Sequence, residues 1–174
     1  AGTVTDIDGN IYNTVIIGTQ IWMVENLKTT KYNDGTDIPL VTEGVEWNNL
    51  NSPAYCWYNN SSGNKYLYGA LYNWFAVGTG KLCPIGWHVP CDSEVIELIN
   101  YNCDERGNMA GIKLRESGNV HWKKCSIWSL SESTNESGFT ALGGSCREAV
   151  PTGNFGILDT NGHWWTTTTW SDND

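Results

Sequence analysis

The chain has 174 residues, an apolar content of 40% and a formal net charge of −9. This length suits one domain with a substantial hydrophobic core, and we expect a single domain over residues 1–174. The negative charge argues against a nucleic-acid partner, because such partners are approached through clustered lysine and arginine. No stretch reaches the roughly 20 apolar residues of a membrane span, so we also expect no membrane insertion.

The cysteines bear on the compartment. Their number is even and their spacing is wide, and they are Cys56, Cys83, Cys91, Cys103, Cys125 and Cys146. No CxxC pair is present for zinc binding or thioredoxin-like redox chemistry. Disulfide bonds in an oxidising compartment are therefore the preferred interpretation. The sequence does not choose among the many pairings that six cysteines allow.

The start of the chain carries strand signals. Residues 4–17 predict a β-hairpin, because Asp8 and Gly9 lie between two runs of β-prone residues. Residues 20–27 predict a further strand.

A polar segment and a first helix follow. Residues 42–64 are polar and predict a loop. Within residues 68–77, Leu71, Trp74 and Phe75 are spaced by three and four positions. This spacing predicts a helix with one apolar face.

A second helix is predicted after Pro90. Apolar residues repeat at helical spacing over residues 95–99. Cys91 stands at the N-cap position, with Glu94 three residues later, as in a capping box.

Beyond residue 102 the chain is rich in glycine. Short β-prone pieces occur at residues 112–114, at Trp122, and at residues 139–142 and 164–169. Two early helices and many short late strands favour an α+β fold.

Five segments resemble a known family, the Fibrobacter succinogenes major paralogous domain. They read DIDGNIY, QIWMVENLKT, YGALYNW, CPIGWHVP and NESGF, and they lie at residues 6–12, 20–29, 68–74, 83–90 and 135–139. The resemblance runs in the same order over nearly the whole chain. It implies a C-type-lectin-like fold, similar also to formylglycine-generating enzymes, with two helices, short twisted antiparallel sheets and long loops. It also implies secreted or surface proteins of bacteria.

The chain departs from the family pattern in three ways. Cys91 replaces the usual Thr or Ser at the N-cap, and Val95 replaces a Trp on the same helix. The family usually continues for about one strand pair where this sequence ends at Asp174. Two interpretations stay open: the sequence has lost a tail, or the domain lacks its closing strands. Family positions imply a disulfide between Cys56 and Cys83, which would flank the first helix.

The sequence does not predict an enzyme. His88, His121 and His163 lie in no HExxH motif and beside no nucleophile motif. Formylglycine-generating enzymes need a reactive cysteine pair, and no pair stands where their motifs would place it. We therefore expect no catalytic residue.

A metal site is not predicted either. Asp6, Asp8 and Asn10 supply oxygen atoms, but the remaining positions of an EF-hand loop are missing. We expect no cofactor, although a structural calcium ion in an acidic loop stays open.

Exposed aromatic residues could bind a sugar ring. The pool comprises Trp47, Trp57, Tyr58, Trp122, Trp128, Trp164, Trp165 and Trp170. The weak candidates for ligand binding are Trp47, Trp57, Trp128 and Trp170, although for any single tryptophan a place in the core or as a loop anchor is the better interpretation.

Glycosylation is a separate expectation. Asn59, Asn60 and Asn135 each stand two residues before a serine, which is the pattern of an N-glycosylation acceptor.

Three functions follow in order of preference. The first is a secreted, non-catalytic structural or adhesin-like protein at the cell surface, able to assemble into filaments by strand exchange. An unclosed sheet leaves unpaired backbone groups that another chain can satisfy. The alternative is a lectin-like module that binds a glycan or another ligand. An enzyme of the formylglycine-generating type comes last. The expected partners are thus another copy of the chain or a surface glycan.

Overall fold

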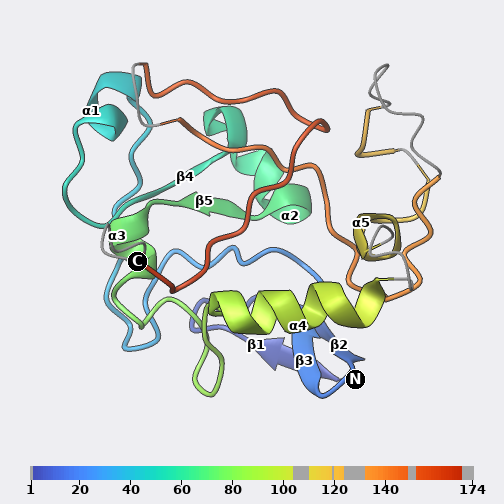
Figure 1. Cartoon of the computed structure of the whole chain (residues 1–174). Helices are drawn as coiled ribbons and strands as arrows, with labels where there is room; N and C mark the ends of the chain where they lie inside the picture. The colour runs from blue at the N-terminus through green and yellow to red at the C-terminus, as the bar shows by residue number, and fades with distance from the viewer. Residues whose placement is uncertain (1, 104–109, 119, 124–131, 149–151, 170–174) are drawn as a thin grey trace.

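The computed structural model describes residues 2–103, 110–118, 120–123, 132–148 and 152–169. The chain begins with a three-stranded antiparallel sheet in the order β1 (Thr3–Thr5), β2 (Ile11–Ile17), β3 (Gln20–Met23) (Figure 1). The predicted hairpin over residues 4–17 is therefore confirmed. The strand predicted at residues 20–27 is present but ends at Met23.

The turn between β1 and β2 is fixed by a buried carboxylate. Asp6 Oδ1 accepts the backbone N–H of Asn10 at 2.8 Å, and Asp6 Oδ2 accepts the hydroxyl of Tyr12 at 2.6 Å. Gly9 has a φ of +82°, a conformation that glycine adopts without strain. The fully buried Tyr12 hydroxyl also accepts the N–H of Lys28, so the hairpin is tied to the segment after β3.

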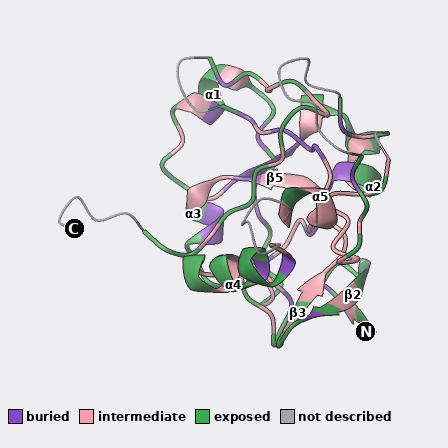
Figure 2. Cartoon of the chain, turned by 45° about the vertical axis from the view of Figure 1, so that its right-hand side comes forward, coloured by how far each residue is buried: buried purple, intermediate pink, exposed green. Residues whose placement is uncertain are grey.

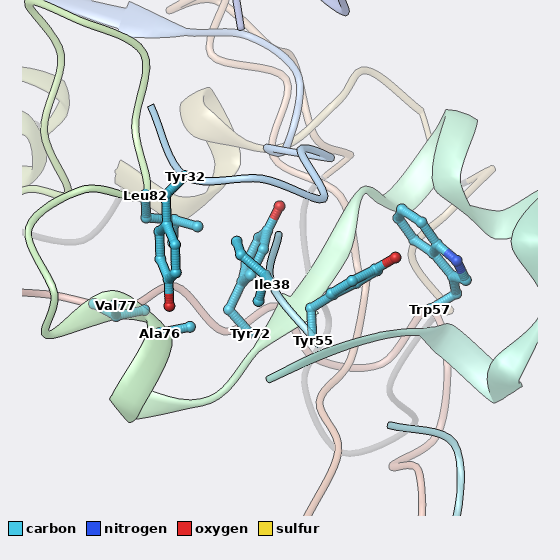
Figure 3. Packing of buried hydrophobic residues seen from close by; sticks show 8 residues of the cluster. All are labelled: Tyr32, Ile38, Tyr55, Trp57, Tyr72, Ala76, Val77 and Leu82. Carbon is cyan, nitrogen blue, oxygen red and sulfur yellow. The ribbon is translucent and has the colours of Figure 1, made fainter. Parts of the chain in front are cut away.

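The main core is aromatic. The antiparallel pair β4 (Tyr55–Trp57) and β5 (Ala70–Tyr72) runs into the short helix α3 (Trp74–Val77). The buried residues that pack together here are Tyr32, Ile38, Tyr55, Trp57, Tyr72, Ala76, Val77 and Leu82 (Figure 3). Tyr72 donates its hydroxyl to the carbonyl of Thr29 at 2.7 Å, which satisfies its one polar atom inside the core.

The helix predicted over residues 68–77 is confirmed only at its end, where α3 lies, and is wrong before it. Tyr68 ends the short helix α2 (Lys65–Tyr68), and the chain then extends as β5 before α3 begins. Gly69 causes the break, because its φ is +73° and an added Cβ would lie 2.7 Å from Leu27 O. This close approach lets Ala70 N donate to Leu27 O at 2.9 Å.

The segment 42–64 is also more structured than the predicted loop. It contains the helix α1 (Gly44–Asn48), the strand β4, and the two 3₁₀ turns η1 (Tyr58–Asn60) and η2 (Ser62–Asn64).

The second predicted helix is confirmed as α4 (Asp92–Asn102), with Cys91 as its N-cap residue. Glu94 Oε2 accepts the backbone N–H of Cys91 at 2.8 Å, as the capping pattern predicts. In both views α4 lies between the N-terminal sheet and the β4–β5 pair (Figures 1 and 2). Gln20 Nε2 joins the sheet to the helix through Glu94 O at 3.1 Å.

The late part of the chain contains little regular structure in its described residues. Residues 112–114 belong to the helix α5 (Ala110–Leu114), which packs on α4, and not to a strand. Trp122, residues 139–142 and residues 164–169 lie in no strand, although Ala141 forms an isolated bridge with Arg115. The predicted strands in these places are therefore wrong.

Arg147 holds the late loops to the rest of the molecule. Its buried guanidinium donates to three carbonyl oxygens, those of Gly153 at 2.9 Å, Val41 at 2.8 Å and Thr42 at 2.7 Å. One side chain thus satisfies three backbone carbonyl groups that a neighbouring strand would otherwise satisfy.

The fold is α+β, as predicted. Cys56, Cys83, Cys91 and Cys146 carry unbonded thiols, so the implied Cys56–Cys83 disulfide is not formed. The described part of the chain is held by packing and hydrogen bonds rather than by disulfides between these four. Cys125 lies outside the described residues.

Candidate functional site

The two predicted ligand-binding tryptophans in the described part are core residues. Trp47 is 6% exposed and Trp57 is 7% exposed. Each packs in a hydrophobic cluster, so neither can offer a ring face to a ligand, and this expectation is wrong. Their role as anchors of the segment 42–64 is confirmed. Trp128 and Trp170 lie outside the described residues.

Two other tryptophans are about half exposed. Trp164 and Trp165 are 48% and 47% exposed. We call this pair the Trp164–Trp165 platform. The segment that carries it crosses β5 and runs toward α3 and the start of α4 (Figure 1).

Hydrogen bonds fix the two indole rings. Trp165 Nε1 donates to Tyr72 O in β5 at 2.8 Å, and Trp164 Nε1 donates to Asn26 Oδ1 at 3.2 Å. Asn26 is itself held by a bond from its Nδ2 to Tyr68 O at 3.0 Å. The polar edge of each indole is thus satisfied by the protein while about half of each side chain remains exposed.

Packing supports the same arrangement. The Trp165 ring lies 5.8 Å from the ring of Trp74, with a 49° angle between the planes. At Gly162, an added Cβ would lie 2.3 Å from the Trp164 ring, so only glycine lets that ring approach the backbone this closely. Downstream, Thr167 N donates to Pro90 O at 2.8 Å and fixes the end of the segment at α4.

The platform has the features of a sugar-stacking surface. An indole offers a large rigid face at a small entropic cost, and aliphatic C–H groups on one face of a sugar ring can pack against it. The chain has a net charge of −9, so an anionic ligand is disfavoured over a neutral one.

The three acceptor asparagines differ in their surroundings. Asn60 donates its Nδ2 to Thr42 O at 2.9 Å. Asn135 uses both side-chain ends on Thr140, with Nδ2 donating to Oγ1 and Oδ1 accepting the backbone N–H, each at 2.9 Å. Asn59 is exposed, and no hydrogen bond of its side chain to another described residue is present. Among the three, Asn59 thus offers the most accessible amide.

A cluster of titratable groups was missed by the sequence analysis. His121 Nδ1 lies 2.9 Å from both carboxylate oxygens of Glu116, and its ring packs edge-on against Tyr68. Tyr68 donates its hydroxyl to Asp159 Oδ1 at 2.9 Å. Burial raises the pKa of the Tyr68 hydroxyl, and the acceptor carboxylate of Asp159 raises it further. Residues this far apart in sequence carry no motif that could have revealed the cluster.

This cluster is arranged to hold the late loops in place. The polar atoms just described bond to one another, so the Tyr68 hydroxyl and the Glu116 carboxylate are already engaged. Elsewhere, His88 Nε2 lies 2.8 Å from Glu94 Oε1 at the start of α4. Both histidine pairs are accounted for by hydrogen bonding within the fold.

The carboxylates of the acidic loop after β1 also accept hydrogen bonds from within the protein. Both oxygens of Asp6 accept hydrogen bonds from the hairpin, and Asp8 Oδ2 accepts the N–H and the hydroxyl of Thr30. Burial alone would raise the pKa of Asp8, but the bonds from Thr30 and Thr29 and the charge of Lys31 lower it on balance. In the described part of the chain no three His, Cys, Asp or Glu residues are grouped to hold a metal ion.

Comparisons with known proteins give a single result. The family model of the Fibrobacter succinogenes major domain matches residues 15–174. No curated protein and no solved structure matches the chain significantly. Within the described residues, none of the helices has the length and apolar character needed to cross a membrane.

Proposed function

The chain belongs to the Fibrobacter succinogenes major domain family, and from that premise we propose that it is an extracellular, non-catalytic, adhesin-like module that binds a neutral glycan. The proposal includes a C-type-lectin-like arrangement of the fold and a place at the bacterial cell surface. The observation that carries the glycan-binding function is the Trp164–Trp165 platform.

Three features support this assignment. The platform residues are half exposed although each indole N–H is bonded within the protein. The rings are held in fixed positions by Trp74 and Gly162, so little side-chain entropy is lost on binding. The even number of cysteines agrees with an oxidising compartment, whereas the unbonded thiols of the described part add nothing to that placement.

An array of neutral oligosaccharides and polysaccharides tests the function. We expect the wild-type protein to bind at least one neutral glycan and to show quenching of tryptophan fluorescence on titration. Substitution of both Trp164 and Trp165 by alanine should weaken binding at least tenfold, which is about 1.4 kcal/mol. Tyr66→Ala is the matched control, because it removes an exposed aromatic ring outside both the platform and the sugar-sized cavity of the fold. Absence of glycan binding in the wild-type protein, or equal binding by the double variant, would overturn the proposal.

A second candidate function is self-assembly by strand addition, and the free edge of β1 favours it. Asp6 N donates to Asn10 O and Thr14 N donates to Gly2 O. Because bonds alternate along an antiparallel strand, the N–H groups of Thr3 and Thr5 point away from β2. Among the described residues, no other segment pairs with this outer edge.

A proline in β1 tests strand addition. Thr5→Pro should leave the β1–β2 pairing intact, because proline is tolerated where the N–H faces outward on an edge strand. It should prevent pairing with a second chain. We expect filaments or large oligomers of the wild-type protein in light scattering and electron microscopy, their loss in Thr5→Pro, and their retention in Thr5→Val. A wild-type protein that is strictly monomeric at high concentration would contradict this second function.

A further inference from the structure

A cavity of about 260 Å³ opens at the far end of α4 from the platform. It lies where α4 meets β2, α5 and the turn at residues 135–138, at the right-hand end of α4 in Figure 1. We call it the α4 cavity. Its volume is slightly below the roughly 300–1,000 Å³ of sites for drug-sized ligands, so it has room for about one sugar ring.

Most of the lining of the α4 cavity is polar, and Tyr101 and Ile16 stand at its apolar side. Tyr101 is 65% exposed, yet its ring is packed on the β2–β3 turn, because an added Cβ at Gly18 would lie 3.0 Å from it. Ile16 of β2 is 57% exposed, whereas the next residue, Ile17, is buried and points to the opposite face of the strand. A ligand with one apolar face could therefore stack on Tyr101 and contact the Ile16 side chain.

The polar lining is built into the fold. Asn102 is only 4% exposed, and its Nδ2 donates to Leu98 O at 2.8 Å. No described residue donates to Asn102 Oδ1, so this oxygen is the atom that Asn102 can offer to a ligand. The oxygen of a buried side-chain amide normally accepts a hydrogen bond.

A loose ion pair completes the lining. Lys113 Nζ lies 3.5 Å from Glu136 Oε2, farther than the roughly 2.7–2.9 Å of a direct charge-assisted hydrogen bond. Both groups therefore keep hydrogen-bonding capacity. The turn that carries Glu136 is fixed, because Ser137 Oγ donates to Lys113 O at 2.9 Å. The charges of the pair cancel, which favours a neutral ligand.

We propose that the α4 cavity binds a single neutral pyranose ring, stacked on Tyr101 and hydrogen-bonded through Asn102, Lys113 and Glu136. A carboxylate and an ammonium group side by side can bridge adjacent hydroxyl groups of a sugar. The carboxylate accepts one hydrogen bond and the ammonium group donates the other. The exposed Ile16 side chain suits an acetamido methyl group, so an N-acetylhexosamine fits the lining as well as a hexose.

This site is independent of the platform. The platform segment is fixed at Pro90, before α4 begins, whereas Tyr101 lies in its last turn. An eleven-residue helix is about 16 Å long. The cavity can therefore bind a sugar whether or not Trp164 and Trp165 bind a glycan.

Amide chemical-shift titration of the full chain tests the inference, with glucose, N-acetylglucosamine, leucine and acetate as probes. We expect saturable shifts at Gly18, Tyr101 and Ser137 with at least one of the two sugars, at a Kd of about 1 mM. Tyr101→Ala and Glu136→Gln should each weaken binding at least tenfold. Tyr66→Ala is the matched control, because Tyr66 is 78% exposed and does not line the cavity; its Kd should stay within twofold.

The outcomes separate the two sites. Alanine at Trp164 and Trp165 should leave the sugar-induced shifts at Gly18 and Ser137 unchanged, even if it abolishes binding to the glycan array. Absence of saturable shifts with both sugars, binding of leucine or acetate instead, or unchanged binding in Tyr101→Ala with a native amide spectrum would each overturn the inference.

Discussion

At the scale of single residues, Arg147 has the most concentrated role. Its guanidinium lies between two aromatic rings, with its carbon 4.8 Å from the ring centroids of both Trp47 and Phe155. No salt bridge to a carboxylate is present for it among the described residues. Carbonyl dipoles and aromatic faces stabilise the buried charge in place of a carboxylate.

We predict that Arg147→Lys lowers the free energy of unfolding by about 2–4 kcal/mol, because an ammonium group cannot reach three diverging carbonyls and leaves buried acceptors unsatisfied. Urea denaturation measures the change. Arg115→Lys is the control, since its Nε bonds to Gly111 O beside it in sequence, and it should cost less than about 1 kcal/mol. Equal effects of the two substitutions would show that the three carbonyl bonds contribute little.

The tryptophans show the limit of prediction at this scale. Composition predicts that some of ten tryptophans must be exposed. Which ones are exposed depends on where the late chain crosses β5, and no local pattern around Trp164 and Trp165 encodes that crossing. Trp47 and Trp57 were candidates because they lie in a polar segment, yet they face inward from that segment.

At the scale of elements, α4 was predicted well because its signals are local. Apolar spacing, a preceding proline and a Glu three residues after the N-cap act within one helix. The helix predicted over residues 68–77 is interrupted at Gly69, where the backbone lies close to Leu27, a residue distant in sequence. No helical pattern reveals that contact. The strand predictions after residue 102 failed for a similar reason. Side-chain hydrogen bonds, those of Arg147 and those between Glu116 and His121, hold these loops in place of strand pairing.

The capping carboxylate of α4 predicts a pH dependence. The backbone N–H of Cys91, and next His88, lower the pKa of Glu94. A lowered pKa in the folded state means that this stabilisation is present above the ordinary glutamate pKa and is lost as the pH falls through the lowered value. We predict that Glu94→Gln costs about 0.5–1 kcal/mol at neutral pH.

Thermal melting across a pH series measures this effect. The difference between wild type and Glu94→Gln should shrink as the pH falls below the ordinary glutamate range, because the protonated carboxyl no longer accepts the Cys91 N–H as an anion. Glu97→Gln, in the next turn of α4, should show a smaller difference at neutral pH. A difference between wild type and Glu94→Gln that persists unchanged at low pH would contradict the assignment of Glu94 as a charged cap.

At the scale of the whole molecule, packing in the described part of the chain takes the place of the expected Cys56–Cys83 disulfide. The even cysteine count predicted a stapled domain, but Cys56 is fully buried in β4 and Cys83 lies at the edge of the aromatic core. Burial raises the pKa of the Cys56 thiol, although the guanidinium of Arg147 acts in the opposite direction. Burial raises the pKa of Cys83 to about 11.

Because the thiolate is the form that oxidises and the pKa of both thiols is raised, Cys56 and Cys83 should resist oxidation in the folded protein. We predict that protein purified without reductant, then unfolded and alkylated with iodoacetamide, carries the label on both Cys56 and Cys83 in peptide mapping. The half-buried Cys91 is the control and should react already in the native state. A linked Cys56–Cys83 peptide would instead restore the pairing that the family resemblance implied. With both thiols free, this part of the chain is stabilised by the aromatic core and by Arg147 instead of by a Cys56–Cys83 bond.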